Sequence, residues 1–256
     1  MAPSPRRTVW TARRARWYAR AAAVSGFPRA ALSALARPLA ECESVLDVGA
    51  GVGILSLPLA RLGRRVTALE PAPAMFRELG RAVRAAGAAE RIRCVPAAWE
   101  TARPGPHDMV LVASVPGVLD DLPAFVRRAG RLARRWVVVV QGAGGPDKFH
   151  LDALYPLLFG RAFASRDGTA HIAAALRTLG VRPTVRIIAY AFDQPVRDLD
   201  EAVAFWRAYL PPLRPSQEGL LRAFLRGRLR RVGGRLRVPI RKRSAVLAWR
   251  PRRGRA

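Results

Sequence analysis

The chain is poor in the side chains that bind metals or form disulfides. Its 256 residues include only two cysteines, Cys42 and Cys94, and three histidines. Two cysteines far apart in the sequence have neither the spacing of a zinc site nor the density of a disulfide-rich scaffold. No metal site is therefore predicted, and both thiols are expected to be buried as small hydrophobic side chains.

Long hydrophobic runs are also missing. The longest, near residues 110–119 and 136–140, fall well short of the roughly 18 to 20 residues that a membrane-spanning helix needs. The arginine-rich N-terminus lacks the continuous apolar segment and the cleavage site of a secretory signal. The chain is nevertheless long enough for one well-buried α/β domain with additions. These features predict a soluble, cytoplasmic protein without a membrane span.

Lysine is nearly absent, and the formal charge of +27 is unevenly distributed. Residues 41–218 hold all 18 acids, whereas residues 1–40 contain eight arginines and residues 222–256 contain fourteen basic residues. Such basic ends can attract an RNA backbone, an anionic membrane surface or an acidic partner. Lys148 and Lys242 are the only lysines, a bias more typical of a GC-rich genome than of selected phosphate contacts. Charge alone therefore predicts nonspecific attraction, and RNA remains an open alternative.

What the sequence does contain is a strand, a glycine-rich turn and a helix start in direct succession. Apolar residues 44–48 predict a buried parallel strand that carries Asp47, and three glycines follow at alternate positions within residues 49–53. Glycines there let the backbone turn sharply and approach a ligand. A dinucleotide fingerprint places its third glycine one position later, where this chain has Ile54. The spacing therefore disfavours a pyrophosphate site of the NAD type.

The turn resembles the first motif of class I S-adenosylmethionine-dependent methyltransferases, in which an acid precedes three alternating glycines. The next predicted strand, residues 65–69, is followed by Glu70 and Pro71, which strengthens the resemblance. The resemblance implies S-adenosylmethionine as the cofactor, with its methionine part held by residues 49–53. Glu70 would accept hydrogen bonds from the ribose hydroxyls, while Pro71 and Met75 would lie beside the adenine.

Three further positions complete the predicted donor site. Asp47 would organise the turn and can reach the donor's amino group through water. Trp99 follows the third predicted strand and can stack on the adenine, and Ser114 can contact donor or acceptor, although structural roles remain open for both. We name no catalytic residue, because no side chain stands out as a general base. The predicted donor site consists of Asp47, Gly49, Ala50, Gly51, Gly53, Glu70, Pro71, Met75, Trp99 and Ser114.

Strands alternate with helices along most of the chain, which predicts an α/β fold with a doubly wound, mostly parallel sheet. The resemblance implies a seven-stranded, Rossmann-like sheet with the site at the carboxyl ends of its strands. We expect a helical cap over residues 1–40, the core over residues 41–193, and the last strand and a basic tail over residues 244–256. The predicted strands span residues 44–48, 65–69, 91–95, 108–112, 136–141, 186–192 and 244–249, and the predicted helices span residues 11–23, 29–39, 54–62, 73–86, 123–133, 151–164 and 171–179.

The segment between the last two predicted strands, residues 194–243, is too long for a hairpin and predicts a helical insertion. Asp198 can begin its first helix, and Ser216 can cap its second. The aromatic residues of the N-terminal helices can either cover the cofactor or fill a core contact, and their helical spacing favours the core contact.

Methyl transfer from a sulfonium is an in-line displacement that needs alignment and exclusion of water, without a metal or a covalent nucleophile. The sequence therefore predicts an S-adenosylmethionine-dependent methyltransferase acting on a small molecule. The fourth strand ends without the Asn/Asp-Pro-Pro-Tyr/Phe signature of amino methylation, which disfavours a DNA target. An RNA methyltransferase with basic arms, and a related protein that binds the donor without turnover, remain alternatives. The sequence identifies neither the acceptor nor the oligomeric state.

Overall fold

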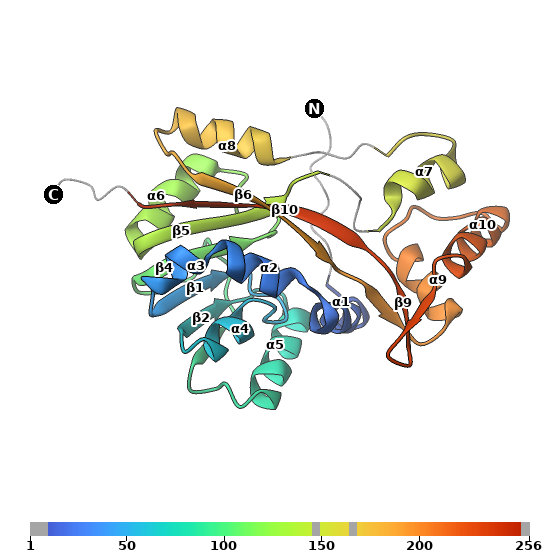
Figure 1. Ribbon diagram of the computed structural model, residues 1–256, viewed down its shortest axis with the longest axis horizontal. Helices are drawn as coiled ribbons and strands as arrows, with labels where there is room; N and C mark the ends of the chain where they lie inside the picture. Colours follow the sequence, from blue (N-terminus) through green and yellow to red (C-terminus); the bar gives the residue numbers. More distant parts are fainter. Residues whose placement is uncertain (1–9, 145–148, 164–167, 252–256) are drawn as a thin grey trace.

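The computed structural model describes residues 10–144, 149–163 and 168–251. Its centre is a seven-stranded sheet with the order β3-β2-β1-β4-β5-β10-β6 (Figure 1). Strand β10 pairs antiparallel with β5 and β6, and the other pairings are parallel. The predicted fold class is thereby confirmed. The strands are β1 (Ser44–Val48), β2 (Arg65–Leu69), β3 (Ile92–Val95), β4 (His107–Ala113), β5 (Ala133–Gly142), β6 (Thr184–Ala191) and β10 (Arg241–Trp249).

The strand order reverses between β1 and β4, and this reversal positions the site. Val48 pairs with Leu69 of β2 on one side and with Val112 of β4 on the other. The carboxyl ends of these three strands therefore lie at one edge of the sheet. Open α/β sheets bind their ligands in the crevice at such a reversal.

Helices cover both faces of the sheet because alternate strand residues point to opposite sides. In β5, Val137 and Val139 belong to one hydrophobic cluster, whereas Val138 and Val140 belong to the other. Figure 1 shows α6 and α8 over one face and α2 to α5 over the opposite face. Their bounds are α2 (Phe27–Ala34), α3 (Ala36–Ala40), α4 (Ser56–Arg61), α5 (Pro73–Ala85), α6 (Leu122–Leu132) and α8 (Gly168–Thr178).

Two of the predicted helices near the N-terminal half are shorter than expected. The helix predicted over residues 29–39 is divided into α2 and α3 at Leu35. Pro38 has no N–H to donate to the carbonyl of Ala34, so a continuous helix would lose that hydrogen bond. The helix predicted to begin at residue 54 begins instead at Ser56, because the turn continues through the intervening residues.

Two later helices also differ from the prediction at one end. Helix α7 (Leu151–Phe159) stops where Gly160 adopts a left-handed φ of 63°, whereas the prediction ran to residue 164, outside the described residues. Helix α10 (Pro215–Arg226) begins before Ser216, with Arg214 at the N-cap and its N–H bonded to Gln217, so the Ser216 cap was wrong. Within the described part of the chain, no helix combines the length and apolar character needed to cross a membrane.

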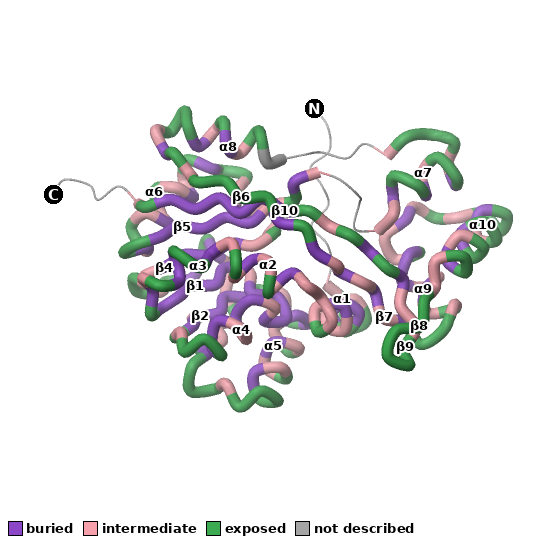
Figure 2. Tube along the Cα trace, in the orientation of Figure 1, coloured by how far each residue is buried: buried purple, intermediate pink, exposed green. Residues whose placement is uncertain are grey.

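The insertion between β6 and β10 is not purely helical, contrary to prediction. It contains α9 (Leu199–Arg207), capped by Asp198 as predicted, and α10, but also a three-stranded sheet of order β7-β9-β8. These strands are β7 (Gln194–Val196), β8 (Arg230–Val232) and β9 (Arg235–Val238). Gly233 and Gly234 join β8 to β9 with φ values of 55° and 74°, as two-residue hairpin turns require. Figure 2 shows this hairpin exposed, in contrast to the central strands.

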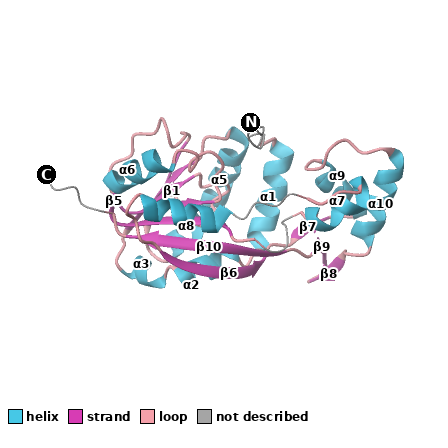
Figure 3. Ribbon diagram, turned by 90° about the horizontal axis from the view of Figure 1, so that it is seen from above, coloured by secondary structure: helices cyan, strands magenta, loops and turns pink. Residues whose placement is uncertain are grey.

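Helix α1 (Ala12–Val24) stands between the sheet and the insertion (Figure 3). One of its sides, which includes Ala15, packs with Val52 of the glycine turn and Met75 of α5. Another side places Trp17 in the core of the insertion, 5.3 Å from the ring of Phe205. We call the carboxyl ends of β1, β2 and β4, where the donor site is predicted, the donor edge. Helix α1 therefore contacts both the donor edge and the insertion.

Candidate active site

The glycine turn connects β1 to α4 through backbone conformations that side chains rarely adopt. Gly49, Gly51 and Gly53 have φ values of 68°, 61° and 84°. A Cβ on Gly49 would lie 2.5 Å from Cγ2 of Val115, and a Cβ on Gly53 would lie 2.9 Å from Cδ1 of Leu79. These two positions thus need both the left-handed backbone and the missing side chain of glycine.

Glu70, directly after β2, joins the glycine turn to the following loop. Its side chain is buried, at 6% exposure, and Oε2 accepts a hydrogen bond from the Gly51 N–H at 2.8 Å. Oε1 accepts one from the Ala72 N–H at 2.8 Å. Burial raises the pKa of Glu70, and these two bonds offset part of that effect. Because each carboxylate oxygen can accept a second hydrogen bond, Glu70 retains acceptor capacity for two hydroxyl groups.

Asp47 is the second acid at this edge, and only 2% of it is exposed. Its Oδ2 accepts a hydrogen bond from Oγ of Ser56 at 2.6 Å. Burial raises the pKa of Asp47 to about 6; the Ser56 bond opposes this rise and the charge of Glu70 adds to it. Among the described residues, neither acid forms an ion pair. The sequence did not predict a role for Ser56. A hydroxyl residue at the start of the helix after the glycine turn was the feature that could have indicated a partner for Asp47.

Most of the other predicted residues lie at the same edge. Ala50 is buried, and its N–H donates to the Leu69 carbonyl at 2.9 Å. Met75 is buried in α5 beside the turn, whereas Pro71 is exposed. Ser114 follows β4 with a left-handed φ of 55°, which is uncommon for a residue other than glycine. The edge thus collects residues from the ends of β1, β2 and β4.

Trp99 is placed differently from the rest. Its indole is 6% exposed, and its ring centre lies 5.6 Å from that of Phe125. The guanidinium of Arg128 stacks on the same ring at 4.3 Å. Both partners belong to α6, so these contacts place Trp99 in the core beneath that helix. Its contact with adenine stays a prediction that none of these contacts supports.

Helix α1 adds Tyr18 to this edge. Burial raises the pKa of the Tyr18 hydroxyl above its usual range, and the negative charges of Asp47 and Glu70 contribute to the rise. The Tyr18 ring lies 5.7 Å from that of Phe192, which directly follows β6. Together with the packing of α1 on the turn, this places α1 over the two unpaired acids.

Comparison with known proteins identifies the segment that carries these features. Residues 45–135 match the family described as a methyltransferase domain. The matched segment begins in β1 and ends in β5, so it includes the glycine turn and Glu70. Over these 91 of its 256 residues the chain is similar to a methyltransferase domain. The prediction from the Asp47, glycine and Glu70 pattern is thereby confirmed at the level of the family.

Two curated relatives match part of this chain. A ubiquinone biosynthesis O-methyltransferase of Methylobacterium nodulans is 42% identical over 99 residues, which are 36% of this chain and 38% of that protein. The protein of the same name from Methylocella silvestris is 37% identical over 111 residues, 43% of this chain and 42% of that protein. The matches thus span about two fifths of the length of these relatives.

The likeness among solved structures extends beyond the matched segment. The crystal structure of a magnesium protoporphyrin IX methyltransferase from Synechocystis, with bound SAH, has a TM-score of 0.51 and 17% identity. The superposition covers 89% of this chain and 84% of that one. At this identity the likeness establishes the fold alone, and its coverage takes in both the methyltransferase segment and the strands that follow it.

Proposed function

We propose that the protein is an S-adenosylmethionine-dependent methyltransferase that acts on a small-molecule acceptor. The observation that carries this proposal is the Glu70 carboxylate, which is buried, bonded to the glycine turn and able to accept two more hydrogen bonds. Asp47, also buried and without an ion pair among the described residues, fits a ligand that brings positive charge. A sulfonium donor with an amino group and a ribose has both properties.

In the proposed reaction the bound donor supplies an electrophilic methyl group, and the chain's own residues orient it. Residues 49–53 hold the amino-acid part close to the backbone, because no Cβ stands in the way at the glycines. Glu70 fixes the ribose through two hydrogen bonds, and Asp47 neutralises the donor's positive charge from beneath the turn. Helix α1 covers the edge and excludes water, which favours an in-line displacement.

The acceptor is proposed to enter between α1 and the insertion. A cavity of about 10 Å³ lies there, which is room for about one water molecule, so side chains must move to admit an acceptor. Phe149 and Tyr209 stack in its wall at 4.2 Å, and such ring faces suit a planar molecule. The names of the curated relatives support a hydroxyl acceptor. The cavity is lined by Tyr18, Phe149, Phe192, Gln194, Phe205, Tyr209 and Ile240.

Isothermal titration with S-adenosylmethionine, S-adenosylhomocysteine and NAD tests the donor assignment. We expect one site for the first two ligands, and Glu70→Ala should weaken their binding by roughly 1–3 kcal/mol, as expected for lost charged hydrogen bonds. Glu43→Ala is the matched control, because the Glu43 side chain is 82% exposed and lies away from this edge. Binding of NAD without binding of either sulfur ligand would overturn the proposal.

Turnover requires a separate measurement. A donor with a labelled methyl group, incubated with a set of small phenols, is expected to label the phenol fraction. Label recovered in added RNA instead would favour an RNA target. Tight donor binding without any labelled product would indicate a protein that binds the donor and does not transfer it.

A further inference from the structure

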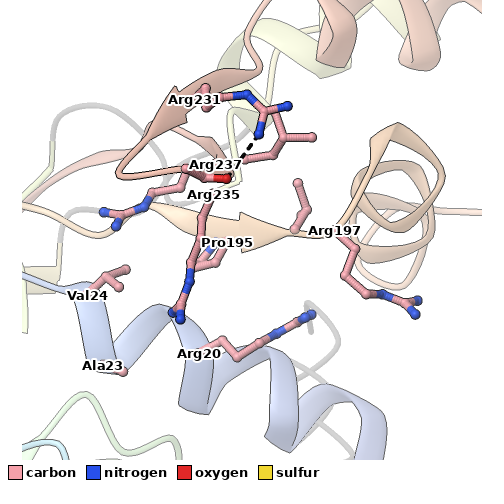
Figure 4. Close-up of a pocket in the computed structure, with 11 residues that line it drawn as sticks. Arg20, Ala23, Val24, Pro195, Arg197, Arg231, Arg235 and Arg237 are labelled. Carbon is pink, nitrogen blue, oxygen red and sulfur yellow. Dashed lines mark hydrogen bonds between the residues drawn. The ribbon is translucent and has the colours of Figure 1, made fainter.

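A hollow on the insertion side of α1 has no part in the proposed methyl transfer. It lies between α1, β7 and the β8–β9 hairpin and has a volume of about 530 Å³. In Figure 4, Arg20 rises from α1 below, while the hairpin arginines come from above. We call this hollow the arginine pocket. Its five arginines are Arg20, Arg197, Arg231, Arg235 and Arg237.

The positive charge of the arginine pocket is only partly neutralised. None of the described residues that line it is acidic, and the nearby Glu201 is bonded to Arg20 and Arg197. In the described part of the chain, the three hairpin arginines form no ion pair. Arg231 donates instead to the carbonyl of Gly234 at 3.0 Å. Positive charge is therefore concentrated in a space that a small ligand can enter.

Two hydrogen-bond donors in this pocket are buried without an acceptor. The Nε atoms of Arg20 and Arg237 are shielded from solvent, and neither has a hydrogen-bond partner among the described residues. Leaving such a charged donor unsatisfied is costly, so proteins rarely bury one without a partner. These two donors come from opposite walls of the pocket, α1 and β9. Each wall of the arginine pocket thus carries a guanidinium whose Nε donor has no acceptor among the described residues.

We infer that the arginine pocket binds a small phosphorylated molecule through a phosphate or diphosphate group. The planar guanidinium presents its N–H groups in a fork that matches phosphate oxygens. The volume falls within the range of small-molecule sites, roughly 300–1,000 Å³. Val24, Pro195 and Leu236 also line the pocket and can contact the carbon part of the ligand.

A second arginine-lined hollow provides an internal control. It lies beside α6 and the end of β10, has a volume of about 690 Å³, and also has five arginines in its lining. Among the described residues, none of those arginines has a buried Nε without a partner. One of them, Arg250, is bonded to Glu41 and stacks on Trp136 at 4.5 Å. Its arginines are Arg37, Arg127, Arg131, Arg182 and Arg250.

The test is isothermal titration of the full chain with inorganic pyrophosphate and inorganic phosphate at physiological ionic strength. We expect a single pyrophosphate site whose Kd rises about tenfold or more in Arg235→Gln/Arg237→Gln, because charged hydrogen bonds are lost. Arg131→Gln/Arg182→Gln removes the same charge from the second hollow and should leave the Kd unchanged. Unchanged S-adenosylhomocysteine affinity and melting temperature show that each variant is folded.

A second variant keeps the proposal testable if the double arginine variant does not fold. Ala23→Glu places a carboxylate in the arginine pocket at an exposed position in the last turn of α1, where the helix dipole disfavours it only slightly. It should weaken pyrophosphate binding to a similar extent. Equal losses in the two arginine variants would overturn the proposal in favour of diffuse attraction to a strongly basic chain. Absence of pyrophosphate binding, or tighter binding of single-stranded RNA through the same arginines, would also overturn it.

Discussion

Two carboxylates, buried Asp47 at the donor edge and partly buried Glu201 in the insertion, have pKa values displaced in opposite directions. At Asp47, burial raises the pKa to about 6, and no cation is paired with it among the described residues. At Glu201, burial also opposes ionisation, but bonds from Arg20, the Arg197 N–H and Trp17 outweigh it and lower the pKa to about 2. Glu201 is thus paired with an arginine, whereas Asp47 has no cationic partner among the described residues.

The difference separates two ways of building a site. The donor edge is shaped by main-chain geometry, since left-handed glycines and backbone N–H groups hold Glu70 in place. The contact between α1 and the insertion is held by side chains, with Trp17 and Arg20 donating to Glu201 at 3.0 and 2.5 Å. An acid without a counter-charge fits a site that receives a charged ligand, whereas a paired acid fits a permanent contact.

The largest expected effect comes from breaking the main-chain geometry. Gly49→Ala should lower the free energy of unfolding by about 3 kcal/mol, because it adds left-handed strain and a collision with Val115. Gly63→Ala is the matched control, since Gly63 has a φ of 81° and no atom within 4 Å of the added Cβ. In urea denaturation the control should lose only the free energy that comes from left-handed backbone strain, roughly 1–2 kcal/mol. Equal losses of unfolding free energy in the two variants would show that the Val115 side chain moves aside without cost and would contradict the prediction.

A smaller loss is expected from breaking the side-chain contact. Glu201→Gln should lower the free energy of unfolding by about 2 kcal/mol at neutral pH, because charged bonds to Arg20 and Trp17 weaken. The folded pKa of about 2 lies below the ordinary 4.5, so this stabilisation is present above about pH 4.5 and is lost as the pH falls through about 2.

Urea denaturation across this pH range checks the expectation. Asp200→Asn in the same helix turn is the control; its side chain is 76% exposed, and an exposed pair contributes at most about 1 kcal/mol. The Glu201 effect should also shrink with added salt, whereas the Gly49 effect should not. If the loss of unfolding free energy in Glu201→Gln did not change with salt, the α1 contact would not be ionic and would not differ from the donor edge in the way described.

The smallest expected effect concerns Asp47, the acid at the donor edge that forms no ion pair among the described residues. Asp47 keeps its proton up to about pH 6 in the folded protein but only to about pH 4 in the unfolded chain. The free energy of unfolding should therefore decrease as the pH rises from about 4 to about 6. Cationic S-adenosylmethionine favours the ionised acid, so its affinity should increase as the pH rises through about 6 and then level off. Asp47→Asn should bind about tenfold more weakly at pH 8 and lose most of this dependence.

Isothermal titration between about pH 5 and about pH 8 checks this dependence. Glu70, whose pKa is also raised, remains in the variant and accounts for any residual slope. Asp152→Asn is the control, because Asp152 is exposed on α7. A pH profile that is the same in Asp47→Asn and in the unmodified protein would exclude Asp47 as the titrating group.

The donor edge was largely predictable from the sequence because its determinants are local. Strands β1 and β2 have the predicted bounds, since each is a short apolar run bounded by turn residues. Asp47, the glycines and Glu70 lie within 24 residues of one another and follow directly from those strands. Their contacts with a donor stay predictions, as does the cytoplasmic location. Cys42 is buried as predicted, but Cys94 is only half-buried.

The insertion was less predictable because its contacts are distant in sequence and its strands are atypical. Glu201 and Arg20 are 181 positions apart, and no pattern within either helix connects them. Arginines in β8 and β9 obscured the alternation of a half-buried strand, so the hairpin was missed. The adjacent Gly233 and Gly234 were the available signal, since two glycines favour a two-residue hairpin turn.

The position of α1 has a consequence for the order of folding during synthesis. Helix α1 is synthesised before the sheet strands, yet Glu201, which accepts hydrogen bonds from it, is made some 180 residues later. Strands β1 to β5 can pair in the meantime, because each finds its neighbours within a short stretch of chain. We therefore expect α1 to dock last. The donor edge is then assembled open on the nascent chain and covered only when the insertion has been translated.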